Sequence, residues 1–247
     1  MSPRAIRWLI VAAILVLWEV LPRIGAVPML FLPPLSTTLA AAAQDWQAYA
    51  SALLITLGEV ALGLVIACGG GILAGAIVGA VPFLRRLLLP VFSSLYAIPL
   101  VILYPALTAW FGIGPESKVA FAGVYGFFPT LLGTAAGIRT IDPQLLLAAR
   151  SMGATLPQLI TRVILPASIP TVLAGLRMGG ALVIVGVVVS EMLISTAGIG
   201  YMISFYRTVL DSPHVFAAIL LVLALTLMFD ALTRALERGC ASWRQTA

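Results

Sequence analysis

Six apolar runs, most of them long enough to cross a lipid bilayer, dominate this sequence and exclude a soluble fold. A membrane helix needs about 20 consecutive apolar residues. The chain is 62% hydrophobic and only 9% charged, whereas soluble domains are about 25% charged. We therefore predict an all-α polytopic membrane protein with six transmembrane helices in a single domain over residues 1–247. The predicted spans are residues 8–21, 53–81, 88–111, 118–138, 169–194 and 213–236.

The first run, residues 8–21, follows two arginines and could be a secretory signal peptide. No clean small-residue cleavage site follows it, which favours a retained membrane helix.

Glycines and prolines predict local features of the second and third spans. Gly71, Gly75 and Gly79 recur at four-residue spacing, and small residues so spaced let membrane helices approach closely. We expect this glycine ridge to face another helix, with a pore lining as the alternative. Pro90 and Pro99 lie inside the third span, together with Pro105. Membrane helices tolerate such residues where neighbours satisfy the freed carbonyls, so this span is predicted to be kinked or broken.

The basic residues predict the orientation. With a cytoplasmic amino terminus, ten basic residues lie inside and three lie outside, namely Arg23, Lys118 and Arg207. The positive-inside rule then places both termini and residues 141–168 in the cytoplasm.

Residues 141–168 form the longest polar-interrupted segment between the apolar runs. Asp142 and Pro143 predict a helix start, and Gly153 predicts its end. This short helix has an apolar face and a polar face that carries Gln144 and Arg150. A second short helix is expected to close at Pro166, before the fifth span begins.

The same segment resembles the coupling loop of ABC importer permeases. The resemblance rests on Ala148, Ala149, Gly153, Leu165 and Pro166, with Leu147 standing where the family usually has Glu. It implies that Leu147, Ala148, Ala149, Arg150, Gly153, Leu165 and Pro166 couple this chain to a separate ATPase. A helix lying on the bilayer surface is the alternative interpretation.

A wider pattern is similar to the permeases that serve nitrate, sulfonate, taurine and related solutes. It includes Gly112 to Gly114, Phe128-Pro129, Gly175 to Arg177, Glu191-Met192 and Gly198 to Gly200. The resemblance implies a type I importer fold in a bacterial inner (plasma) membrane. It also implies a second copy of this chain, two ATPase subunits that use ATP and Mg, and a periplasmic or lipid-anchored binding protein.

Ionisable residues inside spans are the remaining functional candidates, because each is costly in hydrocarbon unless it faces protein or water. Arg177 and Glu191 lie about 40° apart around one helix and roughly 21 Å apart along it, so their shared face is predicted to line the translocation pathway. Asp230 is expected to pair with Arg234 at i+4. The pathway candidates are Glu59, Pro99, Tyr104, Arg177 and Glu191.

The sequence gives little support for a nucleotide-binding, metal or hydrolytic site. The only lysine is Lys118 and the only histidine is His214, so neither a Walker A loop nor a metal or hydrolytic site is predicted. We expect no cofactor, no nucleic acid partner and no enzyme activity in this chain. An ion-coupled carrier or channel that uses Glu59 and Glu191 remains the alternative function.

Overall fold

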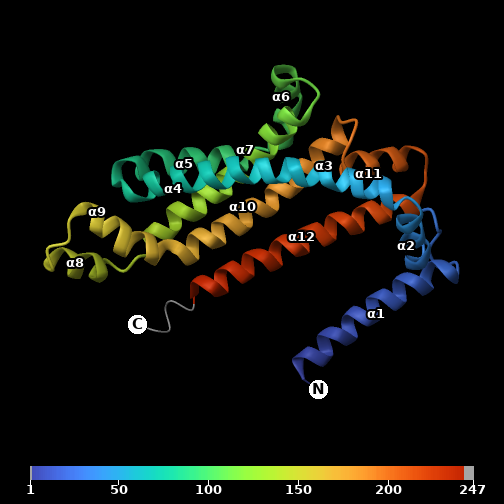
Figure 1. Ribbon diagram of the computed structural model, residues 1–247, viewed down its shortest axis with the longest axis horizontal. Helices are drawn as coiled ribbons and strands as arrows, with labels where there is room; N and C mark the ends of the chain where they lie inside the picture. Colours follow the sequence, from blue (N-terminus) through green and yellow to red (C-terminus); the bar gives the residue numbers. More distant parts are fainter. Residues whose placement is uncertain (1, 242–247) are drawn as a thin grey trace. The chain divides into compact units, whose positions relative to one another are not determined.

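The computed structural model describes residues 2–241, without the side chains of residues 4, 156, 160, 165, 240 and 241. The described chain is almost entirely helical (Figure 1). Its α-helices are α1 Pro3–Arg23, α2 Leu35–Gln44, α3 Trp46–Leu64, α4 Gly70–Ala80, α5 Pro82–Ala97, α6 Tyr104–Phe111, α7 Pro115–Arg139, α8 Pro143–Ser151, α9 Leu156–Leu159, α10 Leu165–Leu193, α11 Ile199–Thr208 and α12 Ser212–Ala241. Two π-helical turns, Val65–Gly69 and Ile160–Ile164, join α3 to α4 and α9 to α10.

Five helical segments of the described chain are long and apolar enough to cross a membrane. They are Ala5–Arg23, Trp46–Ala80, Pro115–Arg139, Pro166–Leu193 and Ser212–Gly239. A sixth span arises if the bent pair Pro82–Ala97 and Leu100–Phe111 counts as one. These segments correspond to the six predicted spans.

The third span is broken, as the prolines predict. Its two helices meet at an angle of 83°, and the break lies at Ile98 and Pro99, both of which have extended backbone. A proline disfavours the helical conformation in the residue before it and has no N–H to donate. Pro99 therefore ends α5 and starts the short 3₁₀ turn Leu100–Leu103.

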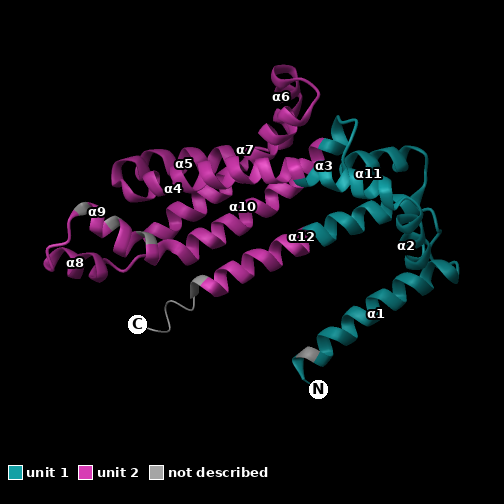
Figure 2. Ribbon diagram, in the orientation of Figure 1, with its two compact units in different colours: residues 1–57, 191–225 teal, residues 58–190, 226–247 magenta. Residues whose placement is uncertain are grey.

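The sequence predicts a single domain. In the structure the chain divides into two compact units (Figure 2). Unit 1 contains residues 1–57 and 191–225, and unit 2 contains residues 58–190 and 226–247. Each unit takes segments from distant parts of the sequence.

In unit 2, the glycine ridge of α4 packs against α7. All three ridge glycines are buried. A Cβ on Gly75 would lie 2.5 Å from the carbonyl oxygen of Leu131 and 2.8 Å from Cβ of Thr134. A Cβ on Gly79 would lie 2.9 Å from Cα of Ala135. The prediction that the ridge faces a helix is confirmed, and the pore-lining alternative is wrong for these positions.

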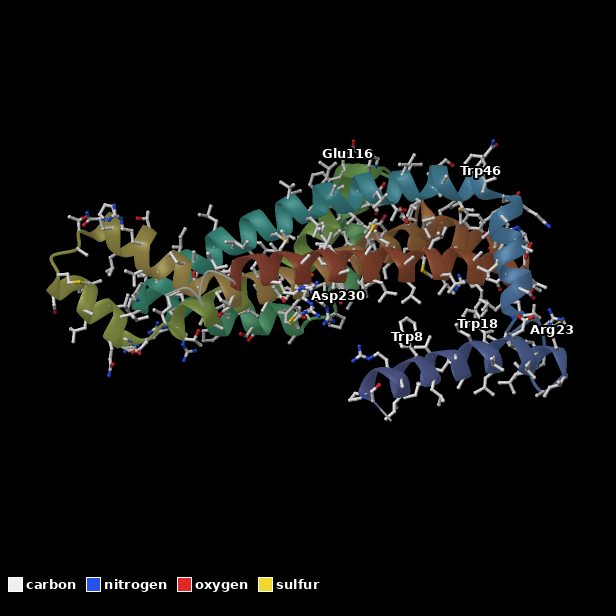
Figure 3. The ribbon with its side chains drawn as sticks, turned by 60° about the horizontal axis from the view of Figure 1, so that its bottom comes forward. Trp8, Trp18, Arg23, Trp46, Glu116 and Asp230 are labelled. Atoms are coloured by element: carbon white, nitrogen blue, oxygen red, sulfur yellow. The ribbon has the colours of Figure 1, made fainter. Side chains whose placement is uncertain are left out.

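In unit 1, polar bonds hold the end of α1 to the start of α2. The indole N–H of Trp18 donates to the Pro33 carbonyl at 3.0 Å, and the Glu19 carboxylate accepts from both the N–H and the hydroxyl of Ser36. Arg23 pairs with Glu19 at 2.6 Å. Trp18 and Arg23 both lie on α1 near this junction (Figure 3).

The described residues leave most apolar side chains of α1 exposed. Trp8 is 72% exposed, and only 6% of the apolar window is buried. A helix of this composition needs lipid or another chain around it.

The fifth span starts earlier than predicted. The second short helix does not close at Pro166, because the turn Ile160–Ile164 continues directly into α10, which begins at Leu165. Pro166 therefore lies just after this π-helical turn, inside a continuous helical stretch, where a proline has no N–H to donate to the preceding turn.

Candidate functional site

The segment predicted to couple the chain to an ATPase begins with a well-defined short helix. Asp142 caps α8 by accepting a hydrogen bond from the N–H of Gln144 at 2.9 Å. At the other end, Gly153 has φ +76°. Its N–H donates to the Arg150 carbonyl, and the N–H of Ala154 donates to the Ala149 carbonyl. These paired bonds form a Schellman motif, which favours glycine at the left-handed position.

Large apolar side chains on both sides of α8 and at its C-cap are exposed. Leu145 is 51% exposed, Leu147 is 67% exposed and Met152 is 81% exposed, whereas Ala149 is buried, with only 5% of its surface exposed. In unit 2, α8 and α9 lie at one end, beside the start of α10 (Figure 1). Around the helix, Leu145 and Met152 lie on the same side as the buried Ala149, whereas Leu147 lies on the opposite side, between Gln144 and Arg150.

The remaining predicted coupling residues border this helix. Ala148 and Arg150 are exposed on α8, and Pro166 is half-buried at the start of α10. Leu165 begins α10, but its side chain lies outside the described part of the structure.

Glu191 lies in a buried polar cluster of unit 1 and is 1% exposed. Its carboxylate accepts a hydrogen bond from the Thr56 hydroxyl at 2.8 Å and from the N–H of Gly200 at 2.7 Å. The Thr56 hydroxyl in turn accepts from the N–H of Ile199 at 3.0 Å. We call Glu191, Thr56 and these two amides the Glu191 cluster. It satisfies two of the amide groups that the first turn of α11 leaves without an intrahelical acceptor.

Gly198 precedes α11 and cannot be replaced without cost. Its φ of +105° favours glycine, and a Cβ there would collide with the Glu191 carboxylate. The carboxylate therefore lies directly against the backbone of Gly198.

Glu59 and Lys118 form an ion pair inside unit 2. The Lys118 ammonium contacts the Glu59 carboxylate, and their side chains are only 6% and 4% exposed, respectively. Lys118, counted among the outer basic residues, lies at the start of α7 and is covered by protein, and its side of the membrane stays a prediction. A buried charge is tolerated when an opposite charge compensates it.

Arg177 joins α10 to α12 within unit 2. Its guanidinium lies 2.6 Å from Asp230 and 3.8 Å from Glu237. Asp230 also accepts a hydrogen bond from Arg234 at 2.7 Å, which confirms the predicted i+4 pair. Asp230 is visible on α12 in Figure 3. Arg177, Asp230 and Glu237 line a cavity of about 490 Å³.

A second cavity, of about 310 Å³, lies in unit 1 between α3, the loop before α11, and α11 itself. We call it the α3–α11 cavity. Its polar and aromatic lining includes Ser51, Thr196, Tyr201, Phe205 and Tyr206. Sequence reasoning did not single out these residues.

A network of ionisable and aromatic groups adjoins the α3–α11 cavity. The Tyr206 hydroxyl donates to Asp45 at 3.4 Å, and the Tyr206 ring stacks on His214 with centroids 4.5 Å apart. His214 also lies 3.3 Å from Asp45 and 2.9 Å from Asp211. Burial, followed by the negative charge of Asp45, raises the pKa of Tyr206. The Tyr206 hydroxyl therefore stays protonated and keeps its role as a donor at neutral pH.

Residues 70–241 match the family model described as binding-protein-dependent transport system inner membrane component. The chain belongs to this family. It is accordingly a multi-pass inner-membrane permease of a transport system, and the capped helix α8 lies within the matched region.

Two relatives cover nearly the whole permease. The putative aliphatic sulfonates transport permease protein SsuC of Bacillus subtilis (strain 168) is 31% identical over 241 residues, covering 96% of this chain and 87% of the relative. The riboflavin transport system permease protein RibX of Chloroflexus aurantiacus (strain ATCC 29366 / DSM 635 / J-10-fl) is 32% identical over 235 residues, covering 93% and 87%.

The permease also shares its fold with solved importer structures. An inward-facing structure of the MetNI methionine ABC transporter matches with a TM-score of 0.62 and 19% identity, covering 86% of this chain and 98% of that chain. At this identity the match shows the fold, and it agrees with the predicted type I importer permease fold.

The predicted pathway residues of the permease do not share one environment. Arg177 borders a cavity, and Pro99 is exposed at the break in the third span. Glu59, Tyr104 and Glu191 are buried, with the Tyr104 ring packed 5.2 Å from that of Phe121. Contact of any of the five with a solute stays a prediction.

Proposed function

We propose that this permease is the membrane subunit of an ATP-driven importer, which takes up a small solute delivered by a binding protein. The observation that carries the proposal is the exposure of large apolar side chains around α8. Leu145 and Leu147, on opposite sides of the helix, and Met152 at its C-cap are exposed, and α8 lies outside the membrane spans. A rigid, capped helix with apolar side chains on both sides is suited to insertion into a groove of a partner protein.

The partner proposed for α8 is a cytoplasmic ATPase. The chain lacks a Walker A sequence, so nucleotide binding and hydrolysis are assigned to that subunit, which uses ATP and Mg. Movement of the ATPase would displace α8, and the direct connection of α9 to α10 would carry the displacement into the membrane. The exposed apolar residue Leu147 replaces the family's usual Glu, so contact at this position is proposed to be apolar.

The complete transporter is proposed to contain two copies of this chain, two ATPase subunits and a periplasmic or lipid-anchored binding protein. The uncovered apolar surface of α1 supports contact with lipid or with the second copy. The proposed solute is of the nitrate, sulfonate or taurine kind, or another small organic compound.

An ion-coupled carrier would need Glu59 or Glu191 to bind a proton or cation reversibly. Glu59 contacts Lys118, and both oxygens of Glu191 accept hydrogen bonds in its cluster. Binding an ion at either carboxylate would disrupt these contacts, so the structure gives the carrier little support. Uptake by the purified chain alone under an ion gradient would favour the carrier.

Replacing Gly153 with proline tests the coupling role. Proline cannot adopt the positive φ of Gly153 and removes its N–H bond to Arg150. We expect Gly153→Pro to abolish the stimulation of ATP hydrolysis by the binding protein, measured on the reconstituted transporter.

Gly153→Asn is the matched control, because asparagine tolerates the left-handed conformation. It should keep most of the stimulation. Unchanged stimulation in Gly153→Pro would remove α8 from the coupling mechanism.

A further inference from the structure

The α3–α11 cavity combines a ring-binding wall with a few hydrogen-bonding groups. The rings of Tyr201 and Phe205 lie 6.0 Å apart at an interplanar angle of 29°, and Phe205 meets Tyr206 edge-on at 5.3 Å. Ser51 and Thr196 add hydroxyl groups to the lining. Sites for small organic molecules are typically apolar and aromatic with a small number of polar groups.

The size of the cavity suits a small ring compound. Its volume of about 310 Å³ is at the lower end of the range of about 300 to 1,000 Å³ that is typical of ligand pockets. Phe205 is 47% exposed, so one wall of the cavity is accessible from outside the unit. Offset stacking on such rings favours a flat partner.

Negative groups contact two of the residues that line this cavity. Asp45 accepts the hydrogen bond of Tyr206. The Glu191 carboxylate lies against the backbone of Gly198. The faces of the aromatic rings add negative electrostatic potential. All of these groups disfavour an anion in the cavity.

The positive groups nearest in sequence or in space to the cavity are poorly placed to bind an anion in it. No lysine, arginine or histidine occurs among the described residues that line the cavity. Arg207 follows Tyr206 in the sequence and is exposed, while His214 stacks behind Tyr206 between Asp45 and Asp211. The two carboxylates that contact His214 offset any positive charge that its imidazole carries.

We propose that the α3–α11 cavity is a solute-binding site for a planar organic ring that carries no negative charge. The site narrows the solute class of the proposed importer, and its role in uptake rests on that proposed function. It favours a ring compound over a sulfonate or nitrate anion. The Glu191 cluster then has a defined role: it holds the first turn of α11 in place and so positions the aromatic wall.

Thiol labelling of the full chain in lipid nanodiscs tests the site. Both native cysteines are replaced by alanine, and Ser51→Cys places a thiol in the cavity. Gln47→Cys is the matched control, since it is exposed on the same helix and does not line the cavity. Each thiol is treated with a cationic and with an anionic methanethiosulfonate reagent, the latter carrying an ethylsulfonate group.

The electrostatic part of the proposal predicts a charge preference at Ser51→Cys. The ratio of cationic to anionic labelling rates should exceed the ratio at Gln47→Cys by on the order of tenfold at low salt. An equal ratio at the two positions, or faster anionic labelling at Ser51→Cys, would overturn the proposal.

The ring-binding part predicts selective protection. The uncharged planar compound 4-aminopyrimidine should slow the labelling of Ser51→Cys. Ethanesulfonate at the same concentration should not slow it. Adding Tyr201→Ala should remove the protection, while the exposed Leu54→Ala on α3 should leave it intact. Equal protection by ethanesulfonate, or no protection by 4-aminopyrimidine, would overturn the proposal.

This labelling needs no ATPase, so the two proposals can fail separately. Loss of charge preference and protection in a chain that still recruits an ATPase would overturn only the solute site. Selective protection in a chain that recruits no ATPase would overturn only the importer.

Discussion

Lys118→Ala should destabilise the permease by about 3 to 5 kcal/mol, because removing one partner of a buried ion pair leaves the other charge uncompensated. Glu59 and Lys118 are both almost completely buried in unit 2. The measurement is the shift in thermal unfolding of the detergent-solubilised chain. Arg23→Ala, which breaks the partly exposed pair with Glu19, is the control and should have a small effect.

A double-mutant cycle separates the ion pair from packing. Replacing both partners with apolar residues of similar size, Glu59→Leu with Lys118→Met, should recover much of the stability that either single change removes. Additive losses in the double variant would show that the two side chains do not stabilise each other, and would contradict this description of unit 2.

Gly75→Leu should prevent α4 from packing on α7. Even a Cβ at this position would lie 2.5 Å from the Leu131 carbonyl oxygen, and the backbone of α7 cannot move away without losing its own packing. Overpacking of this kind costs about 1 to 3 kcal/mol or more. We expect a large loss of monodisperse protein in size-exclusion chromatography, together with a lower unfolding temperature.

Gly58→Ala is the matched control for the glycine ridge. Gly58 also lies in a membrane helix, but a Cβ at this position would have no heavy atom within 4 Å. This variant should fold as well as the unaltered chain, since alanine favours helix over glycine. Equal yields of Gly75→Leu and Gly58→Ala would contradict the close approach of α4 and α7.

The features that the sequence predicted are those encoded by local patterns. Apolar runs located the spans, Pro99 located the break in the third span, and the spacing of Gly71, Gly75 and Gly79 predicted a helix contact. Asp142 and Gly153 set the ends of α8 because capping depends on residues only a few positions apart.

The features that the sequence did not predict depend on contacts between distant residues. Glu59 and Lys118 are 59 positions apart in the sequence, and nothing near either residue identifies the other as its partner. Arg177 and Asp230 are similarly distant. Local reasoning could pair Asp230 only with Arg234, one turn away, and this pair proved to be part of a larger group.

Helix α11 was also missed, although it organises the α3–α11 cavity. Only ten residues, Ile199–Thr208, form this helix, which is too short to register as a membrane span. Two signals could have indicated it: Gly198 at a helix start, and a carboxylate nine positions before Gly200. In the structure, Gly198 has the positive φ that precedes α11, and the Glu191 carboxylate accepts a hydrogen bond from the N–H of Gly200.

The most direct test of the importer is to tag this permease, recover it from native membranes and identify the bound proteins by mass spectrometry. We predict recovery of an ATPase with a Walker A sequence. Met152→Asp should abolish that recovery by replacing the exposed apolar side chain at the C-cap of α8 with a charge. Gln144→Asp, which adds the same charge to the polar face, should preserve it. Recovery of the permease alone, or ATPase binding unchanged by Met152→Asp, would contradict the coupling role of α8.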